Sequence, residues 1–285
     1  MKRTATVRSK TREVGPTGLN EVDRLSTLSP CTIRDYIAGV SAYVRKSSGL
    51  KPGPKKAAQI RLSSALARAL ADDLSERIPK LRERLVTHEQ KVAGGLRTAN
   101  ADVSESHPLD GLRLAVELKP VNLAVGRAIW NRFGDIRTFA INIHLKFPFA
   151  VVGGVLVIPT YEETGTTAAK AALIEEEMAA EGKAAASDEE EQSVIVKKDA
   201  SEIEPIAPAR RATTHLINRA IERFTRAGGR RSEADAPHLL EAIAVVVYDP
   251  DSGAIDVNLP AANSGLRWEE FIDALSSAYR ARFED

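Results

Sequence analysis

The chain has 285 residues, an apolar fraction of 43% and a net charge of +1, which fits one large globular domain or two small ones. Its single cysteine, Cys31, excludes an internal disulfide and argues against a cysteine-based metal site. The longest apolar run, around FPFAVVGGVLVIP, is too short to cross a bilayer, and the first residues lack the apolar stretch of a signal peptide. We therefore expect a cytoplasmic protein without membrane contact.

Charge is distributed unevenly along the chain. Residues 1–61 carry 13 Lys and Arg against four Asp and Glu, whereas residues 161–205 carry 13 acids against four bases. The basic segment could meet a polyanion such as DNA, because basic clusters supply the sequence-independent part of such binding. A solvated tail is the alternative for the first residues, and we expect residues 1–28 to be a flexible basic N-terminus. Residues 163–205 are predicted to be an acidic low-complexity insertion that stays off DNA.

Helices are predicted to follow the basic N-terminus. Ser29 and then Pro30 are typical of a helix start, leading into CTIRDYIAGVSAYVRKSSG. A long helical stretch runs from about Lys55 to Glu89, with leucines mostly four residues apart. Pro79 should break this stretch into two helices.

The central part of the chain, residues 94–162, is predicted to have the order β-β-α-β. Two apolar stretches within 95–119 form a strand pair, and the apolar run that ends at residue 159 is typical of a central strand covered on both faces. The pair Gly153-Gly154 inside that strand indicates a bulge or a close packing contact. Between the strands lies a helix whose apolar stripe consists of Val125, Ile129, Phe133, Ile136, Ala140 and Ile143.

The C-terminal part, residues 206–285, is predicted to complete the same domain with the order α-β-β-α. ATTHLINRAIERFTRAGG is an amphipathic helix, LLEAIAVVVYD and AIDVNLP are two strands, and RWEEFIDALSSAYRARF is a closing helix. The fold class that follows is α/β, a mixed central β-sheet flanked by helices. We expect one domain over 29–285, with a helical N-terminal part at 29–93 and the insertion at 163–205.

Three charged residues are predicted to converge on the strand pair. Glu117 and Lys119 lie two residues apart on one strand and therefore share a face. A hairpin turn at Asp110-Gly111 would place Asp102 opposite Lys119 and diagonal to Glu117, although Pro108 could widen the loop. Two carboxylates suit Mg²⁺, a hard cation that prefers oxygen ligands, and an adjacent ammonium suits phosphodiester hydrolysis.

The pattern resembles the PD-(D/E)xK nuclease superfamily. The resemblance rests on Asp102 in ADV and on VELK, which contains Glu117 and Lys119, with the β-β-α-β order around them. In size and order the chain resembles type II restriction endonucleases. The resemblance implies that Asp102 and Glu117 are metal ligands for Mg²⁺ and that Lys119 positions water or stabilises charge. It also implies a restriction-endonuclease-like core and a homodimer that cuts double-stranded DNA, one strand per subunit.

Some residues leave alternatives open. Ala101 stands where the motif has proline, and Asp110 in Pro108-Leu109-Asp110 is a rival first ligand, although it looks like turn chemistry. Glu83 or Glu89, both expected on a helix, could add a carboxylate to the metal site or simply face solvent. Polar residues of the helix after the motif could contact the DNA backbone or form its solvated face; these are Asn122, Arg127, Asn131 and Arg132.

Two functions are therefore expected from the sequence. The first is a Mg²⁺-dependent DNA endonuclease of the restriction type. The alternative is a non-cleaving DNA-binding or regulatory protein with a nuclease-like fold. Both expectations assume that the Glu-x-Lys triplet is functional. If the triplet occurs by chance on a solvated strand, neither function follows from it.

Overall fold

The computed structural model describes residues 15–122, 125–164 and 209–284. Its helices are α1 (Asn20–Leu25), α2 (Ile33–Lys46), α3 (Pro52–Arg77), α4 (Val125–His144), α6 (Thr214–Ala227) and α7 (Trp268–Phe283), with 3₁₀ turns at Ser47–Gly49 and Pro79–Leu81. Its strands are β1 (Gln90–Val92), β2 (Ala99–Ala101), β3 (Val103–His107), β4 (Gly111–Pro120), β5 (Val151–Pro159), β6 (Tyr161–Thr164), β7 (Ala209–Ala212), β8 (Ala242–Asp249) and β9 (Ala254–Ile255).

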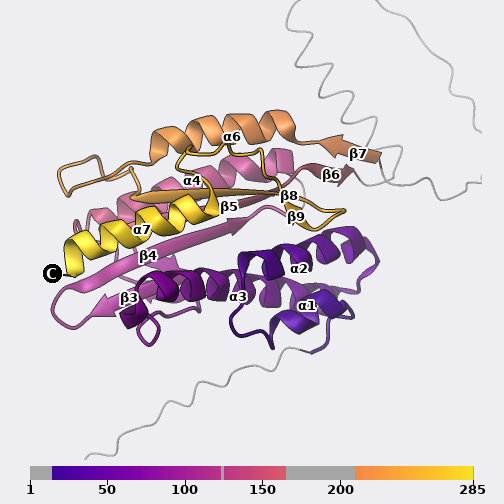
Figure 1. Cartoon of the computed structure of the whole chain (residues 1–285), viewed down its shortest axis with the longest axis horizontal. Coiled ribbons are helices and arrows are strands. Elements are labelled where there is room, and N and C mark those ends of the chain that lie inside the picture. The colour runs from indigo at the N-terminus through magenta and orange to yellow at the C-terminus, as the bar shows by residue number, and fades with distance from the viewer. Residues whose placement is uncertain (1–14, 123–124, 165–208, 285) are drawn as a thin grey trace, which may run out of the picture.

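A mixed five-stranded sheet in the order β3-β4-β5-β8-β9 forms the centre of the fold, which confirms the predicted α/β class. The strands β4, β5 and β8 are parallel, and β3 and β9 add antiparallel edges. The N-terminal helices α1–α3 and the C-terminal α7 contribute to the apolar cluster on one face, and α4 and α6 cover the other (Figure 1). β1 pairs with β2, and β6 with β7, in two small separate sheets.

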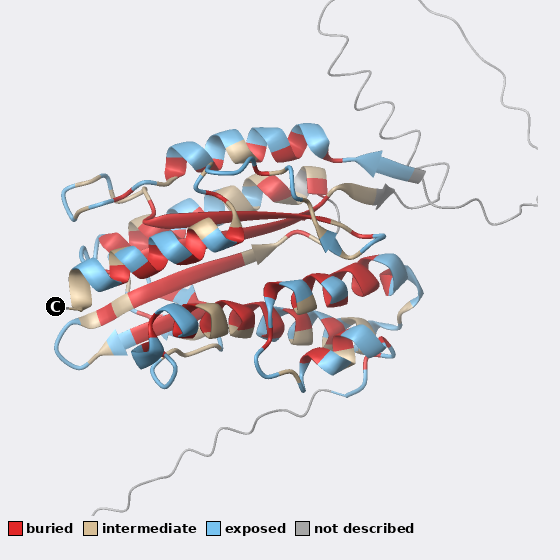
Figure 2. Cartoon of the chain, in the orientation of Figure 1, coloured by how far each residue is buried: buried red, intermediate tan, exposed pale blue. Residues whose placement is uncertain are grey.

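The three central strands are buried along most of their length (Figure 2). Because helices cover both faces, the sequences of β5 and β8 are nearly continuous apolar runs and not alternating ones. Val116 and Leu118 of β4 are buried. They face the cluster formed with α3 and α7, whereas Ala115 belongs to the cluster formed with α4 and α6.

The N-terminal part differs from the prediction in three places. Within the segment 1–28, expected to be flexible, α1 buries Val22 and Leu25 against α2 and α3, because apolar residues three apart share one helix face. The helix expected at Ser29 begins instead at Ile33, where Thr32 and Asp35 form a reciprocal capping box. Pro79 does end α3, but a 3₁₀ turn and a loop follow where a second helix was predicted. Residues 1–14 lie outside the described residues, and so do residues 165–208, which include most of the acidic insertion.

The later elements agree with the prediction more closely. Of the apolar stripe on α4, every residue is buried except Phe133, which is half-buried. Both α6 and α7 form where the amphipathic patterns placed them. The strand predicted for AIDVNLP is shorter, since pairing with β8 stops at Ile255.

Gly153 and Gly154 are packing contacts, and no bulge interrupts β5 at this point. A Cβ atom on Gly153 would lie 3.1 Å from Phe271 of α7, and one on Gly154 would lie 2.6 Å from Ile136 of α4. The two glycines therefore let helices approach the sheet closely from opposite faces.

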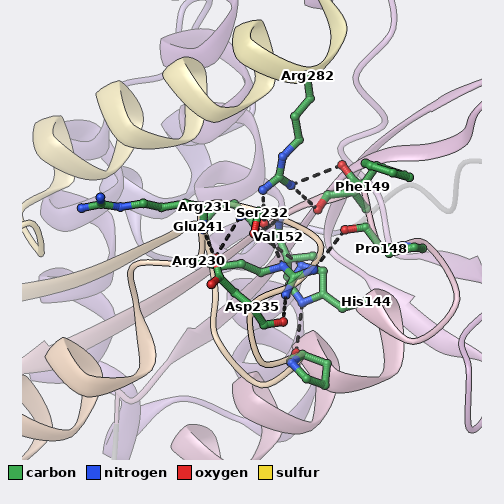
Figure 3. A network of polar contacts seen from close by, with 12 residues as sticks. His144, Pro148, Phe149, Val152, Arg230, Arg231, Ser232, Asp235, Glu241 and Arg282 are labelled. Atoms are coloured by element: carbon green, nitrogen blue, oxygen red, sulfur yellow. Dashed lines mark hydrogen bonds and ion pairs between the residues drawn. The ribbon is translucent and has the colours of Figure 1, made fainter.

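A buried ion network joins five parts of the fold (Figure 3). Glu241, immediately before β8, has a fully buried side chain and contacts His144 at 3.3 Å, Arg230 at 3.2 Å and Arg282 at 2.8 Å. Its carboxylate also accepts a hydrogen bond from the Val152 amide at 2.8 Å. Burial alone would raise the pKa of Glu241, but the His144 contact, the Val152 amide and Arg282 together hold it below its ordinary value. The network connects the end of α4, the start of β5, the loop after α6, the start of β8 and the end of α7.

No helix among the described residues is both long enough and apolar enough to cross a membrane.

Replacing Gly154 by alanine should destabilise the protein by about 1–3 kcal/mol, because the new methyl group overpacks against Ile136. Gly134, an exposed position in α4 with nothing within 4 Å of its added Cβ, is the matched control. Gly134→Ala should stabilise by about 0.5–1 kcal/mol through helix propensity. Urea denaturation measures both, and equal effects in the two variants would contradict the packing role of Gly154.

Glu241→Ala should lower the free energy of unfolding by about 3–5 kcal/mol, because it leaves Arg230 buried without its carboxylate partner. Glu222→Ala, which removes an exposed ion pair with Arg226, should cost about 0.5 kcal/mol or less. Denaturant unfolding compares the two. A cost below about 1 kcal/mol for Glu241→Ala would show that the network is dispensable.

Candidate functional site

A cavity of about 380 Å³ lies between β4, the β1–β2 sheet and α4. Its lining includes four acids and two cations: Glu89, Asp102, Glu117, Asp135, Arg97 and Lys119. All three residues predicted to form the site, Asp102, Glu117 and Lys119, therefore line one cavity.

Glu117 and Lys119 come from β4. Glu117 points toward the α4 face of the sheet, and its side chain is buried, with 8% exposed. A carboxylate is unusual here because helices cover both faces of the strand. The Lys119 ammonium forms an ion pair with Glu117 Oε1. A charged pair in this position replaces apolar packing, and the cavity beside it supplies the solvent that such a pair needs.

Asp102 lies between β2 and β3, level with Glu117. Its amide donates to the Val116 carbonyl at 3.1 Å, and its Oδ2 accepts from the Leu118 amide at 2.7 Å. The carboxylate is thus fixed against the strand that carries Glu117 and Lys119.

The register that brings Asp102 there differs from the predicted one. Val103 pairs with Val116, so Asp102 faces Glu117 and not Lys119. Two irregularities cause the difference. The turn is a three-residue loop, 108–110, closed by the pair His107 and Gly111, and β4 carries an extra residue at Arg113. The same bulge turns Leu112 to the Glu117 side of the sheet, whereas strict alternation along β4 would put it on the opposite side with Leu114.

The two carboxylates have raised pKa values for the same main reason. Burial raises the pKa of Glu117 from 4.5 to about 7, with Asp102 and Asp135 adding repulsion and Lys119 opposing the shift. Burial also raises the pKa of Asp102, with a contribution from Glu89, against the Leu118 amide and Lys119. The cavity therefore concentrates negative charge that its own cations only partly offset.

The other acids considered as metal ligands differ in whether they line the cavity. Asp110 lies in the turn, is paired with Arg113 and His107, and does not line the cavity. Glu83 lies in a turn and also does not line it. Glu89 does line the cavity, but it precedes β1 and lies on no helix; Asn100 donates to its carboxylate.

The helix after the motif contributes residues that sequence reasoning did not select. Asp135 of α4 lines the cavity and pairs with Arg132 at 3.0 Å, so Arg132 already has an acidic partner. Helical spacing could have indicated Asp135, since Thr138, Phe139 and Asn142 follow on the same face and also line the cavity. Asn122 and Asn131 do not line it, and the side chain of Arg127 lies outside the described residues.

Arg97 is the other residue that was missed. The segment 95–98 was predicted to begin a strand, but it is a loop that leads into β2. The local sequence pattern does not indicate this loop, because the loop is held by hydrogen bonds to Asn142 of the distant α4.

The donor set fits a Mg²⁺ ion. Asp102 and Glu117 offer carboxylate oxygens in one cavity that has room for water. Both have raised pKa values, which a bound cation would lower. Within the described part of the chain, no group of three or more His, Cys, Asp and Glu is placed to hold a metal. Mg²⁺ does not require such a group, because it is commonly held by one or two carboxylates together with waters and substrate phosphate.

No protein-family model, curated protein or solved structure matches the chain.

Glu117→Gln should stabilise the metal-free protein above neutral pH. The folded-state pKa of Glu117 is about 7 against an ordinary 4.5, so its penalty is absent below pH 4.5, grows as pH rises, and is complete above pH 7. At about 1.4 kcal/mol per pKa unit, the full penalty is of the order of 3 kcal/mol. Thermal unfolding in EDTA should show a gain in Tm for the variant that is larger at about pH 8 than at about pH 5.

The exposed Glu222→Gln is the control for that measurement. Its Tm difference from the parent should be small at both pH values. A Glu117→Gln gain that does not change with pH would contradict the burial argument.

Proposed function

We propose that the protein is a Mg²⁺-dependent endonuclease that hydrolyses phosphodiester bonds in double-stranded DNA, of the type II restriction kind. The observation that carries the proposal is the joint placement of Asp102, Glu117 and Lys119 on one cavity. The order β3-β4-α4-β5 supports it, since it agrees with the β-β-α-β arrangement that the resemblance to PD-(D/E)xK nucleases implies.

In this proposal Asp102 and Glu117 hold the metal. The Leu118 amide fixes Asp102 Oδ2, so the carboxylate is oriented before any ion arrives. When bound, the ion supplies Lewis acidity and neutralises charge on a phosphate oxygen. The Lys119 ammonium can donate a hydrogen bond to the attacking water and stabilise the negative charge that develops on the phosphoryl oxygens.

Exposed arginines on the same face of the sheet support a DNA partner. Arg219 and Arg223 of α6 stack over Trp130 at 5.0 and 4.4 Å, and Arg137 lies 5.9 Å from the Phe133 ring centroid. Stacking orders these guanidinium groups and leaves their N–H donors available for phosphate oxygens. A homodimer would let two such sites cut the two strands of a palindromic sequence.

A second candidate is a DNA-binding protein that does not cleave. The ion pair between Glu117 and Lys119 favours it, because each of the two groups is engaged by the other. Incubation of plasmid DNA with the protein and Mg²⁺, with and without EDTA, separates the two. Discrete EDTA-sensitive fragments support the nuclease, and a mobility shift without cutting supports the alternative.

The catalytic assignment is tested by four substitutions. Asp102→Ala and Glu117→Ala should each reduce Mg²⁺-dependent cleavage by about 1,000-fold or more, because each removes a metal ligand worth several kcal/mol of charge stabilisation. Lys119→Ala should be similarly inactive but keep metal binding, since an ammonium is not a ligand. Single-turnover cleavage and calorimetric Mg²⁺ titration measure these effects.

Asp110→Asn is the control and should cleave like the parent, because a turn aspartate tolerates asparagine. If Asp110→Asn is inactive while Asp102→Ala cuts normally, Asp110 is the ligand and the site is assigned wrongly. If all four variants cut like the parent, the cavity is not the active site.

A further inference from the structure

The loop 94–97 is fastened to the end of α4 by one buried side chain. Asn142, which is 2% exposed, accepts hydrogen bonds at Oδ1 from the amides of Leu96 at 2.8 Å and Arg97 at 3.1 Å. Its Nδ2 donates to the Arg97 carbonyl at 2.7 Å. The Gly95 amide also donates to the Asn142 carbonyl at 2.7 Å. The backbone on both sides of the Arg97 Cα atom is therefore fixed.

The glycines of this loop are required by the same contact. A Cβ atom on Gly94 would lie 2.3 Å from Asn142 Nδ2 and 2.3 Å from the Arg97 carbonyl oxygen. A Cβ atom on Gly95 would lie 2.4 Å from the Cβ atom of Leu145. Any other residue at either position would push the loop off α4.

This arrangement presents Arg97 at the cavity. Arg97 is exposed and lines the cavity, and within the described residues its guanidinium has no hydrogen bond or ion pair. Lys119, the other cation of the lining, is already paired with Glu117. A rigid backbone and an unengaged guanidinium are thus combined at the edge of an acidic site.

Phosphate entering this cavity needs such a group. Four carboxyl groups line it, and they repel a phosphodiester anion. We propose that Arg97 binds a phosphate of the nucleic acid at the cavity, and that Asn142 and the glycine loop are positioning residues for it. A guanidinium suits this role because its planar N–H groups can contact two phosphate oxygens at once. The proposal rests on the proposed function for its substrate class, nucleic acid.

The test uses the full chain with Arg97→Ala, Arg97→Lys and the control Arg34→Ala. Arg34 is an exposed arginine of α2, on the opposite side of the sheet from the cavity, and among the described residues it makes no hydrogen bond or ion pair. The first readout is the affinity for a short random-sequence DNA duplex, measured by fluorescence anisotropy at several salt concentrations with Ca²⁺ in place of Mg²⁺. The second is single-turnover cleavage of plasmid with Mg²⁺.

Arg97→Ala should weaken duplex binding about tenfold, the scale of one charge-assisted hydrogen bond, and reduce the slope of log K against log salt by about one. Arg97→Lys should recover the slope but only part of the affinity, because lysine keeps the charge without the planar geometry. Arg34→Ala should match the parent. Arg97→Ala binding with the affinity and slope of the parent would overturn the inference.

The two proposals fail in different ways. If the parent cuts DNA in an Asp102-dependent manner but Arg97→Ala binds and cuts like the parent, the inference fails and the nuclease stands. If the parent does not cut but Arg97→Ala loses one phosphate contact in the salt series, the nuclease fails and the phosphate site stands.

Discussion

The pairing of the buried Glu241 carboxylate with its three cationic partners is the interaction on which the arrangement of this fold depends most. It is fully buried, and burial of a lone carboxylate costs several kcal/mol, so its position is tolerable only while His144, Arg230 and Arg282 remain beside it. Each partner comes from a different part of the chain, and each also donates to a backbone carbonyl nearby (Figure 3). The requirement to keep this charge paired therefore fixes the end of α4 relative to β5, β8 and α7.

The candidate site uses the part of the molecule that this network fixes. His144 is the last residue of α4, and Asn142, two residues before it, holds the Arg97 loop. Asp135 lies on the same helix two turns earlier and lines the cavity opposite β4. Because one end of α4 is held by the buried ion network, the residues of α4 that line the cavity are held in place as well. Such a site has its groups in position before a ligand binds.

The sequence predicted the fold class and placed Glu117 and Lys119 together because both depend on local periodicity. Asp102 still joined them because the register error was two residues, and a shift of two residues keeps a side chain on the same face. Side chains two residues apart on a strand share a face whatever the rest of the chain does. It did not predict the correct register, because the extra residue at Arg113 and the three-residue loop depend on how β3 meets β4. It also missed Arg97, since the loop that presents it exists only through contacts with Asn142, 45 residues away.

The energetics of the cavity connect these elements to chemistry. Burial raises the pKa of both Glu117 and Asp102, so keeping the two groups charged at the cavity costs stability. The ion pair with Lys119 relieves part of this strain and at the same time keeps the ammonium on the strand next to the carboxylates. A divalent cation would relieve more of it and would release Lys119 from Glu117, because the carboxylate oxygens would then face a larger charge. Lys119, which pairs with Glu117, is thus also the group that a bound cation would leave available, so the ion pair is compatible with the proposed catalysis.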